Sequence, residues 1–324
     1  MFKTSFRGED MAKIGFVFPG QGSQKQGMLA ELAAEYPIVL DIFTRASEVL
    51  CQDLWRICQS DLDGSLNQTE ITQPALLAAS VAIGTLWLDR GGPRPLIMSG
   101  HSLGEYSALV LAGVLAFEDA IAVVNQRGKF MQKAVGPGEG KMAAIVGLDD
   151  AKLIEICARA ETIGTVSAAN FNSPGQIVIA GEAAAVDRAI EWCKESGARR
   201  ALPLNVSVPS HCPLMKPAAD ALAEVLADIS FKEPDIPVVQ NVSGAIQTEP
   251  EQIKENLVRQ LHKPVLWVDC VRAMREAGVQ KLVEIGPGRV LCGLVKRIVP
   301  ELGCVASEDP QVFKNLVMEA SGLN

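Results

Sequence analysis

The chain has 324 residues, 48% of them hydrophobic and 21% charged, and a formal net charge of −8. These values are typical of a globular protein with a large core, here expected to form one large domain and a smaller one. The 38 acidic residues outnumber the 30 basic ones. This argues against nucleic acid as the main partner, because phosphate binding requires a positive field.

The eight cysteines follow no spacing typical of a disulfide framework or a zinc site. We therefore expect reduced thiols in a cytoplasmic protein, and a structural role for Cys212. The first ten residues lack the apolar core of a secretory signal. We take Tyr106 to Phe117 as the longest apolar stretch, which is too short to cross a bilayer. No membrane partner is expected.

The predicted elements of the first part of the chain alternate between buried strands and helices. In chain order they are a strand at 14–18, helices at 26–35, 37–51 and 74–88, a strand at 95–99 and a helix at 103–115. Pro74 is expected in the first turn of the helix at 74–88. The alternation predicts an α/β domain with a largely parallel sheet.

The pattern changes after the Gly- and Pro-rich segment 136–140. The following elements are expected in the order β-α-β-β-α-β, at 141–148, 149–161, 164–170, 175–181, 183–196 and 199–206. This order is typical of a ferredoxin-like unit. Parallel-sheet features return at 237–241 and 281–285, with a helix from Val290. We therefore predict an α/β-hydrolase-like catalytic domain made of residues 13–137 and 206–308, with a ferredoxin-like subdomain, residues 138–205, inserted into it.

The segment Gly100-His101-Ser102-Leu103-Gly104 matches the G-x-S-x-G pattern of a nucleophile elbow. In such an elbow, a sharp turn from strand to helix exposes the serine Oγ at the carboxyl end of the sheet. The predicted flanking strand and helix fit this requirement. The alternative is an ordinary turn with a helix-capping serine. We predict that Ser102 is a nucleophile.

A serine nucleophile needs a base, and the chain has three histidines. His101 adjoins the serine and should point elsewhere, while His262 is expected at a helix end. His211 lies in a loop where the chain re-enters the large domain, and such loops often carry catalytic groups. We expect His211 to be the base, with a structural histidine as the alternative. No acidic residue between Ser102 and His211 stands out as a third member, which indicates a dyad.

The loop Pro19-Gly20-Gln21-Gly22-Ser23-Gln24 lacks the Lys-Ser/Thr of a phosphate loop, so nucleotide binding is not expected. Its position suits one amide of an oxyanion hole, with the other from Leu103, although an ordinary turn is equally compatible. Arg127 lies in a largely apolar helical segment. An inward guanidinium there would grip a carboxylate, whereas a lone arginine more often lies on a solvated face.

These pieces together resemble the malonyl-CoA:acyl-carrier-protein acyltransferase family of bacterial fatty-acid synthesis, free-standing type. The matching stretches cover nearly the whole chain in family order. They are FVFPGQGSQ (16–24), TQPAL (72–76), GHSLGEYSAL (100–109), RGKFMQ (127–132), FNSPGQ (171–176), VPSHCPLMKPAAD (208–220), RQL (259–261) and EIGPG (284–288). Residues 1–12 fall outside the resemblance.

The resemblance implies that Ser102 is acylated, that His211 is the base, and that the main-chain carbonyl of Gln260 supports this histidine in place of a carboxylate. Val208-Pro209-Ser210 is similar to the free-standing fatty-acid type, which favours malonyl over branched acyl groups.

The remaining implied roles concern substrate binding. Gln21 and Leu103 would supply the oxyanion-hole amides, Arg127 would bind the malonyl carboxylate, and Asn172 would line the cleft. The implied reaction is ping-pong transfer of malonyl from malonyl-CoA to the phosphopantetheine thiol of acyl carrier protein, with no cofactor and no metal. The alternatives are a serine thioesterase or hydrolase of acyl-CoA, an acyltransferase of a polyketide pathway, and a non-catalytic scaffold.

The family implies a small, acidic carrier protein as a transient partner. Because this chain is acidic as well, a local basic patch must receive that protein. Two dibasic clusters, Arg199-Arg200 and Lys296-Arg297, are predicted to form this patch, and solvated faces are the alternative.

Overall fold

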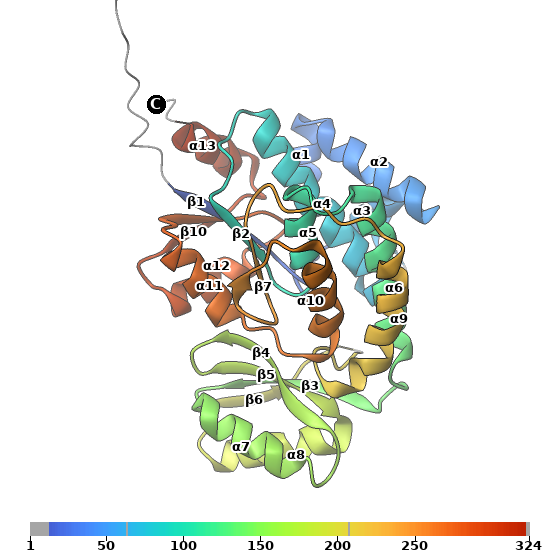
Figure 1. Ribbon diagram of the computed structural model, residues 1–324, viewed down its shortest axis with the longest axis vertical. Helices are drawn as coiled ribbons and strands as arrows, with labels where there is room; N and C mark the ends of the chain where they lie inside the picture. Colours follow the sequence, from blue (N-terminus) through green and yellow to red (C-terminus); the bar gives the residue numbers. More distant parts are fainter. Residues whose placement is uncertain (1–12, 63, 207, 322–324) are drawn as a thin grey trace, which may run out of the picture.

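The structure, a computed structural model, describes residues 13–62, 64–206 and 208–321. A six-stranded sheet, sheet A, lies inside the larger part of the molecule (Figure 1), with the strand order β10-β9-β1-β2-β7-β8. All neighbouring strands are parallel except β7 and β8. The bounds are β1 Ile14–Phe18, β2 Ile97–Gly100, β7 Val238–Gln240, β8 Ala245–Ile246, β9 Lys281–Glu284 and β10 Gly303–Ala306. The predicted largely parallel sheet is confirmed.

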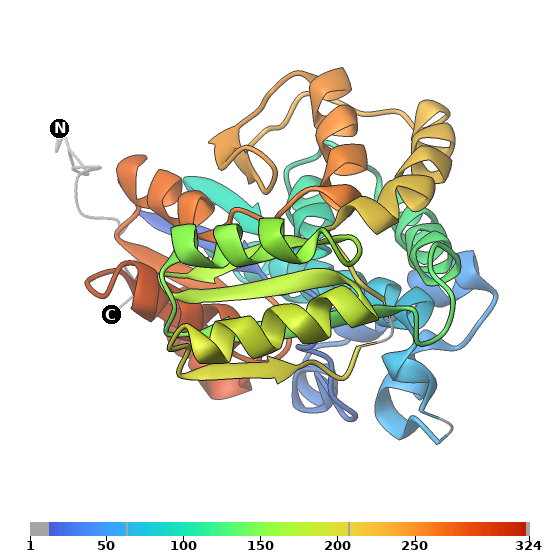
Figure 2. The same cartoon turned by 90° about the horizontal axis from the view of Figure 1, so that it is seen from below.

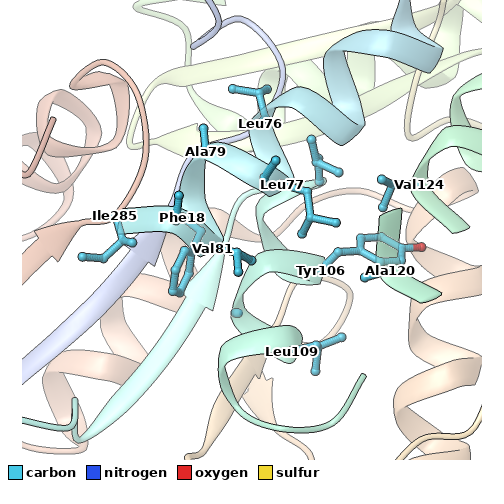
Figure 3. Close-up of a cluster of buried hydrophobic side chains, with 14 of the residues drawn as sticks. Phe18, Leu76, Leu77, Ala79, Val81, Tyr106, Leu109, Ala120, Val124 and Ile285 are labelled. Carbon is cyan, nitrogen blue, oxygen red and sulfur yellow. The ribbon is translucent and has the colours of Figure 1, made fainter. Parts of the chain in front are cut away.

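Strand β1 is buried on both faces, as its uninterrupted apolar run predicts. Phe16 and Phe18 belong to one core cluster, whereas Val17 belongs to another. Figure 3 shows Phe18 packed against Val81 of α4, close to Ile285 at the end of β9. Successive side chains of a strand point to opposite faces, so helices must cover both sides of this sheet.

Two groups of helices supply this cover. The first core cluster contains residues of α1 Ala30–Glu35, α2 Ile38–Leu50, α3 Leu54–Ser60, α4 Thr69–Asp89, α5 Gly104–Leu111, α6 Phe117–Lys133, α9 Lys216–Ala227, α10 Pro250–His262 and α13 Pro310–Ala320. The second contains residues of α11 Trp267–Glu276 and α12 Val290–Ile298. The result is a sheet between helical layers, which brings the ends of its strands to one edge where a site forms.

Helix α4 is longer than predicted and begins at Thr69, so Pro74 lies inside it rather than in its first turn. Proline cannot donate to the carbonyl four residues earlier, that of Glu70. Asn125 of α6 supplies the missing donor, with its Nδ2 atom 2.8 Å from the Glu70 oxygen. This side chain explains how the helix continues through the proline.

Helix α4 also corrects the prediction that Tyr106–Phe117 is the longest apolar stretch. At 21 residues, α4 is long and apolar enough to cross a membrane, but 89% of its most apolar window is buried inside the molecule. It therefore has the burial of a core helix.

The predicted β-α-β-β-α-β order is observed in a separate antiparallel sheet, sheet B, with the strand order β4-β5-β3-β6. The elements are β3 Gly140–Val146, α7 Asp150–Ala160, β4 Val166–Ser173, β5 Gln176–Glu182, α8 Ala183–Glu195 and β6 Arg200–Pro203. Helices α7 and α8 cover the face of sheet B that points away from sheet A (Figures 1 and 2). The predicted domain limits at residues 138 and 205 stay a prediction.

Some elements differ from the sequence-based expectations. The helix expected at 26–35 is wrong in its first turn, because Leu29 adopts a left-handed conformation (φ 62°) and α1 begins only at Ala30. Helix α3 and strand β8 were not predicted. Helix α13 lies beyond the predicted end of the catalytic domain at residue 308, yet its Phe313 is buried in the main core.

Candidate active site

Ser102 lies at a sharp turn between β2 and α5, in the left-handed conformation (φ 51°) that a nucleophile elbow imposes. A Cβ atom on Gly100 would overlap the main chain of Gly104, and one on Gly104 would overlap the carbonyl of Phe18. Only glycine fits at these two positions. Asn241 stabilises the turn, because its Oδ1 accepts the Ser102 N–H at 2.7 Å.

His211 contacts the serine directly. Its Nε2 atom lies 2.8 Å from Ser102 Oγ, and its Nδ1 atom lies 2.7 Å from the main-chain oxygen of Gln260. A carbonyl oxygen only accepts, so Nδ1 carries the proton and donates it to Gln260. Nε2 is therefore free to accept the proton of Ser102. The predicted dyad and the predicted support from Gln260 lie together in the structure.

The surroundings of His211 keep its imidazole neutral. The side chain is only 3% exposed. Burial, with a further contribution from the Arg127 charge, lowers the pKa of His211 to about 3. An unprotonated base is thus available throughout the neutral range.

Arg127 points inward from α6, although it carries a full charge, and is 1% exposed. Its NH1 donates to Gln73 Oε1 at 2.7 Å, and its NH2 donates to Gln260 Oε1 at 2.9 Å and to Ser102 Oγ at 3.3 Å. Burial lowers the pKa of Arg127, but a guanidinium stays protonated at neutral pH. A fixed cation beside the serine can bind an anionic substrate group.

A buried network that was missed in the sequence supports these groups. Glu105 of α5 is fully buried, and its Oε2 accepts from the Asn241 main-chain N–H (2.9 Å) and from Gln260 Nε2 (3.1 Å). Gln260 Nε2 also donates to the Ser102 carbonyl at 3.0 Å. Two features of the sequence could have indicated this network. One is Glu105 at the start of the otherwise apolar helix α5, and the other is the pair Gln240-Asn241 at the end of the otherwise apolar strand β7.

A cavity of about 130 Å³ opens over the dyad, and its lining includes Gln21, Ser102, Leu103, Arg127 and His211. In the part of the chain that the structure describes, the main-chain N–H groups of Gln21 and Leu103 donate no hydrogen bond. Two unused donors beside the serine suit an oxyanion.

Asn172 differs from its predicted position. The neighbouring Asn170 lines the cavity, whereas Asn172 accepts a hydrogen bond from His101, with 2.8 Å between Nε2 and Oδ1. Nearby, His101 also packs on the Trp267 ring, with 5.5 Å between centroids. Asn172 thus joins sheet B to the elbow. Its side chain reaches the site through His101.

The structure also places the other residues that the sequence analysis singled out. Cys212 is buried and its Sγ donates to the Pro209 carbonyl, which fits a structural thiol. His262 ends α10. Arg199, Arg200 and Arg297 line one cavity of about 660 Å³ next to the β4–β5 turn, while Lys296 lies outside this lining.

The fold and the site together define a class: an α/β enzyme in which a serine and a histidine, in hydrogen-bond contact beside a buried arginine, can carry an acyl group. Comparison with known proteins narrows this class. Residues 15–309 match the model of the acyl transferase domain family.

The chain is 56% identical to the malonyl CoA-acyl carrier protein transacylase of Escherichia coli K12 over 303 residues, which is 94% of this chain and 98% of the relative. An acyl carrier protein S-malonyltransferase from Vibrio cholerae superimposes with a TM-score of 0.93 at 55% identity, covering 94% and 100% of the two chains. A malonyl-transacylase in complex with its holo type II PKS acyl-carrier protein gives 0.93 at 54% identity, covering 94% and 99%. The chain belongs to the acyl transferase family of malonyl CoA-acyl carrier protein transacylases.

Proposed function

We propose that this protein transfers the malonyl group of malonyl-CoA to the phosphopantetheine thiol of acyl carrier protein, for fatty-acid synthesis. The observation that carries the proposal is the position of Ser102 Oγ, 2.8 Å from the unprotonated nitrogen of His211 and 3.3 Å from the Arg127 guanidinium. The nucleophilic Ser102 Oγ thus contacts both its base and a cation that can bind the substrate carboxylate. The eight free cysteines agree with a reducing compartment, and we assign the reaction to the cytoplasm.

In the first half-reaction, His211 Nε2 takes the proton of Ser102 as Oγ attacks the thioester carbon. The negative charge that develops on the thioester oxygen is stabilised by the unused N–H groups of Gln21 and Leu103. The intermediate then collapses, the carbon–sulfur bond breaks, the leaving sulfur takes the proton from His211, and coenzyme A leaves as the thiol. Malonyl is now held as an ester of Ser102.

Arg127 binds the free carboxylate of malonyl during this step. The guanidinium donates three hydrogen bonds, all to neutral oxygens, of Gln73, Gln260 and Ser102. Within the described residues no ion pair compensates its positive charge, which is therefore available to the substrate. A charged partner is the stronger ligand for such a group. This favours malonyl over acyl groups without a carboxylate.

In the second half-reaction, His211 removes the proton of the pantetheine thiol, whose ordinary pKa of about 8.5 makes it easily activated by a neighbouring imidazole. The thiolate attacks the acyl carbon, and Ser102 Oγ leaves and regains a proton from His211. One base therefore serves both half-reactions. We place the docking of the carrier protein at the basic cavity formed by Arg199, Arg200 and Arg297, with Lys296 beside it on α12.

The test is intact-mass detection of a malonyl adduct after incubation with malonyl-CoA, with its site located by digestion. The Ser102→Ala variant is expected to form no adduct and to transfer nothing. His211→Ala is expected to slow both half-reactions together. An adduct on Cys212 would overturn the serine mechanism. Release of malonate at the same rate with and without carrier protein would indicate a hydrolase instead.

A further inference from the structure

Two cysteines far from the serine are in direct contact. Cys292 lies in the first turn of α12 and Cys304 lies on β10, and their Sγ atoms are 2.6 Å apart. That separation is only about half an ångström longer than a disulfide bond of roughly 2.05 Å. The two thiols of the reduced protein are therefore already placed for bonding.

Both cysteines lie on elements that are fixed relative to each other. Glu284, at the end of β9, accepts the N–H groups of Leu291 and Cys292 at 3.0 and 2.8 Å and so holds the start of α12. Strand β10 pairs with β9, and Cys304 lies opposite Leu282. The same strand β9 thus positions both sulfur atoms, and little movement is needed to join them.

A metal ion fits this cluster less well, although Glu284, Cys292 and Cys304 bring three ligand atoms within 4.8 Å of one another. Two thiolates on a tetrahedral zinc ion, each about 2.3 Å from the metal, stand roughly 3.8 Å apart, well beyond the present sulfur separation. The Glu284 carboxylate already accepts main-chain hydrogen bonds with both oxygens. The contact favours a sulfur–sulfur bond.

The pair is also reachable. Cys292 and Cys304 are partly exposed, and β10 is an edge strand of sheet A, whereas Cys58, Cys157, Cys193, Cys212 and Cys270 are buried. The Cys304 hydrogen bond, burial and the nearby Glu284 charge raise the pKa of Cys292. Cys304 lies on this edge strand, whereas Cys292 is held in the first turn of α12 by Glu284, so we take Cys304 as the thiol that reacts first and Cys292 as the one that follows.

We propose that Cys292 and Cys304 are a reversible dithiol–disulfide pair, oxidised by low-molecular-weight disulfides such as glutathione disulfide. The Cys304 thiolate attacks one sulfur of glutathione disulfide and forms a mixed disulfide, releasing one glutathione thiol. The Cys292 thiolate then attacks Cys304 Sγ and releases the second. The protein loses two electrons and two protons, and two molecules of glutathione are formed.

The experiment uses the full-length protein, equilibrated with glutathione disulfide, quenched in acid, alkylated and digested with trypsin. Cleavage at Arg289, Lys296, Arg297 and Lys314 places the two cysteines on different peptides, 290–296 and 298–314. Only a disulfide keeps these peptides together. We expect the linked pair as the main oxidised product, and its disappearance after treatment with dithiothreitol.

Single variants separate this pair from ordinary thiol modification. Cys292→Ser should stop at a stable glutathione adduct on Cys304, because the second thiol is missing. The exposed Cys51 is the internal control and should acquire glutathione only, without any linked peptide. Malonylation of Ser102 from malonyl-CoA, measured on the same samples, reports separately on the proposed function.

Two results would overturn the inference. One is glutathione on Cys304 of the unaltered protein with no linked peptide, as at Cys51. The other is zinc that copurifies at one ion per chain, is lost in Cys292→Ser and protects both thiols from alkylation.

Discussion

Arg127 is a buried cation that forms no ion pair within the described residues, and its Nε atom has no hydrogen-bond partner there. Such an arrangement is costly unless a ligand completes it. In Arg127→Ala, the malonyl carboxylate would be buried unpaired, at a cost of about 3–5 kcal/mol. We expect kcat/KM for malonyl-CoA to fall by roughly 10² to 10³ or more.

Acetyl-CoA is the matched control for this variant, because acetyl has the same thioester and no carboxylate. Its transfer should be spared or improved. The measurement is kcat/KM for both acyl donors with one carrier protein. Equal losses for the two donors would show that Arg127 only supports the fold of the site.

Single side chains were predicted best where the chemistry requires a local pattern. The elbow glycines identify Ser102, and the small number of histidines identifies His211. Glu105 and Asn241 were missed because their hydrogen-bond partners are far away in the sequence. Asn241, for example, accepts the N–H of Ser102, which lies 139 positions earlier in the chain. No local pattern shows that a glutamate in the first turn of a helix is buried rather than solvated.

At the level of elements, Glu105 joins α5, the end of β7 and α10 through one buried carboxyl group. Burial raises its pKa from the ordinary 4.5 to about 7. Between these two values the folded protein keeps a proton that the unfolded chain has lost. The stabilisation linked to this proton is complete below pH 4.5 and is lost as the pH rises through about 7.

Glu105→Gln removes the titration and keeps an oxygen acceptor for Asn241. Between about pH 5 and about pH 8, the unmodified protein should lose up to about 3 kcal/mol more of its free energy of unfolding than the variant does. Urea unfolding of both proteins at the two pH values measures this difference. Identical pH dependence would mean that Glu105 stays ionised in the fold.

Helices α4 and α6 depend on each other through Asn125 and the Glu70 carbonyl that Pro74 leaves without a donor. Asn125→Ala should therefore destabilise the protein by about 1–3 kcal/mol. In a Pro74→Ala background the helix regains its own N–H donor at position 74, so the same change should cost about 1 kcal/mol or less. A double-mutant cycle by urea unfolding gives the coupling, and additive effects would contradict it.

The elements predicted best are those whose hydrophobic residues follow one clear pattern, such as the continuous apolar run of β1 and the strand and helix patterns of the six elements of sheet B and its helices. Residues 206–280 were hard to assign, since α9, α10 and α11 are short amphipathic helices between irregular segments. Helix α9 packs on α6 and α11 packs on β4, both from distant parts of the sequence, and α10 packs on α9. Tertiary contacts rather than local propensity decide these helices.

For the whole molecule, the formal charge of −8 repels an acidic carrier protein at long range, so association depends on where the positive charges gather. Arg200 begins β6 and Arg199 directly precedes it, and Arg297 lies on α12 of the larger part, where it donates a hydrogen bond to Gln176 of β5. The basic cavity thus spans sheet B and α12. It adjoins β4, the strand that carries Asn170 into the active site.

Reversing Arg199 and Arg200 to Glu should raise KM for the carrier protein, most strongly at low salt, where screening is weak. Malonylation of Ser102 from malonyl-CoA should change much less. The matched control is Arg90→Glu with Arg94→Glu, which alters the net charge equally but lies after α4 and outside the basic cavity. Steady-state kinetics at two ionic strengths distinguish the pairs. If both double variants raise KM equally, the repulsion is global; if neither does at low salt, the carrier protein docks on another surface.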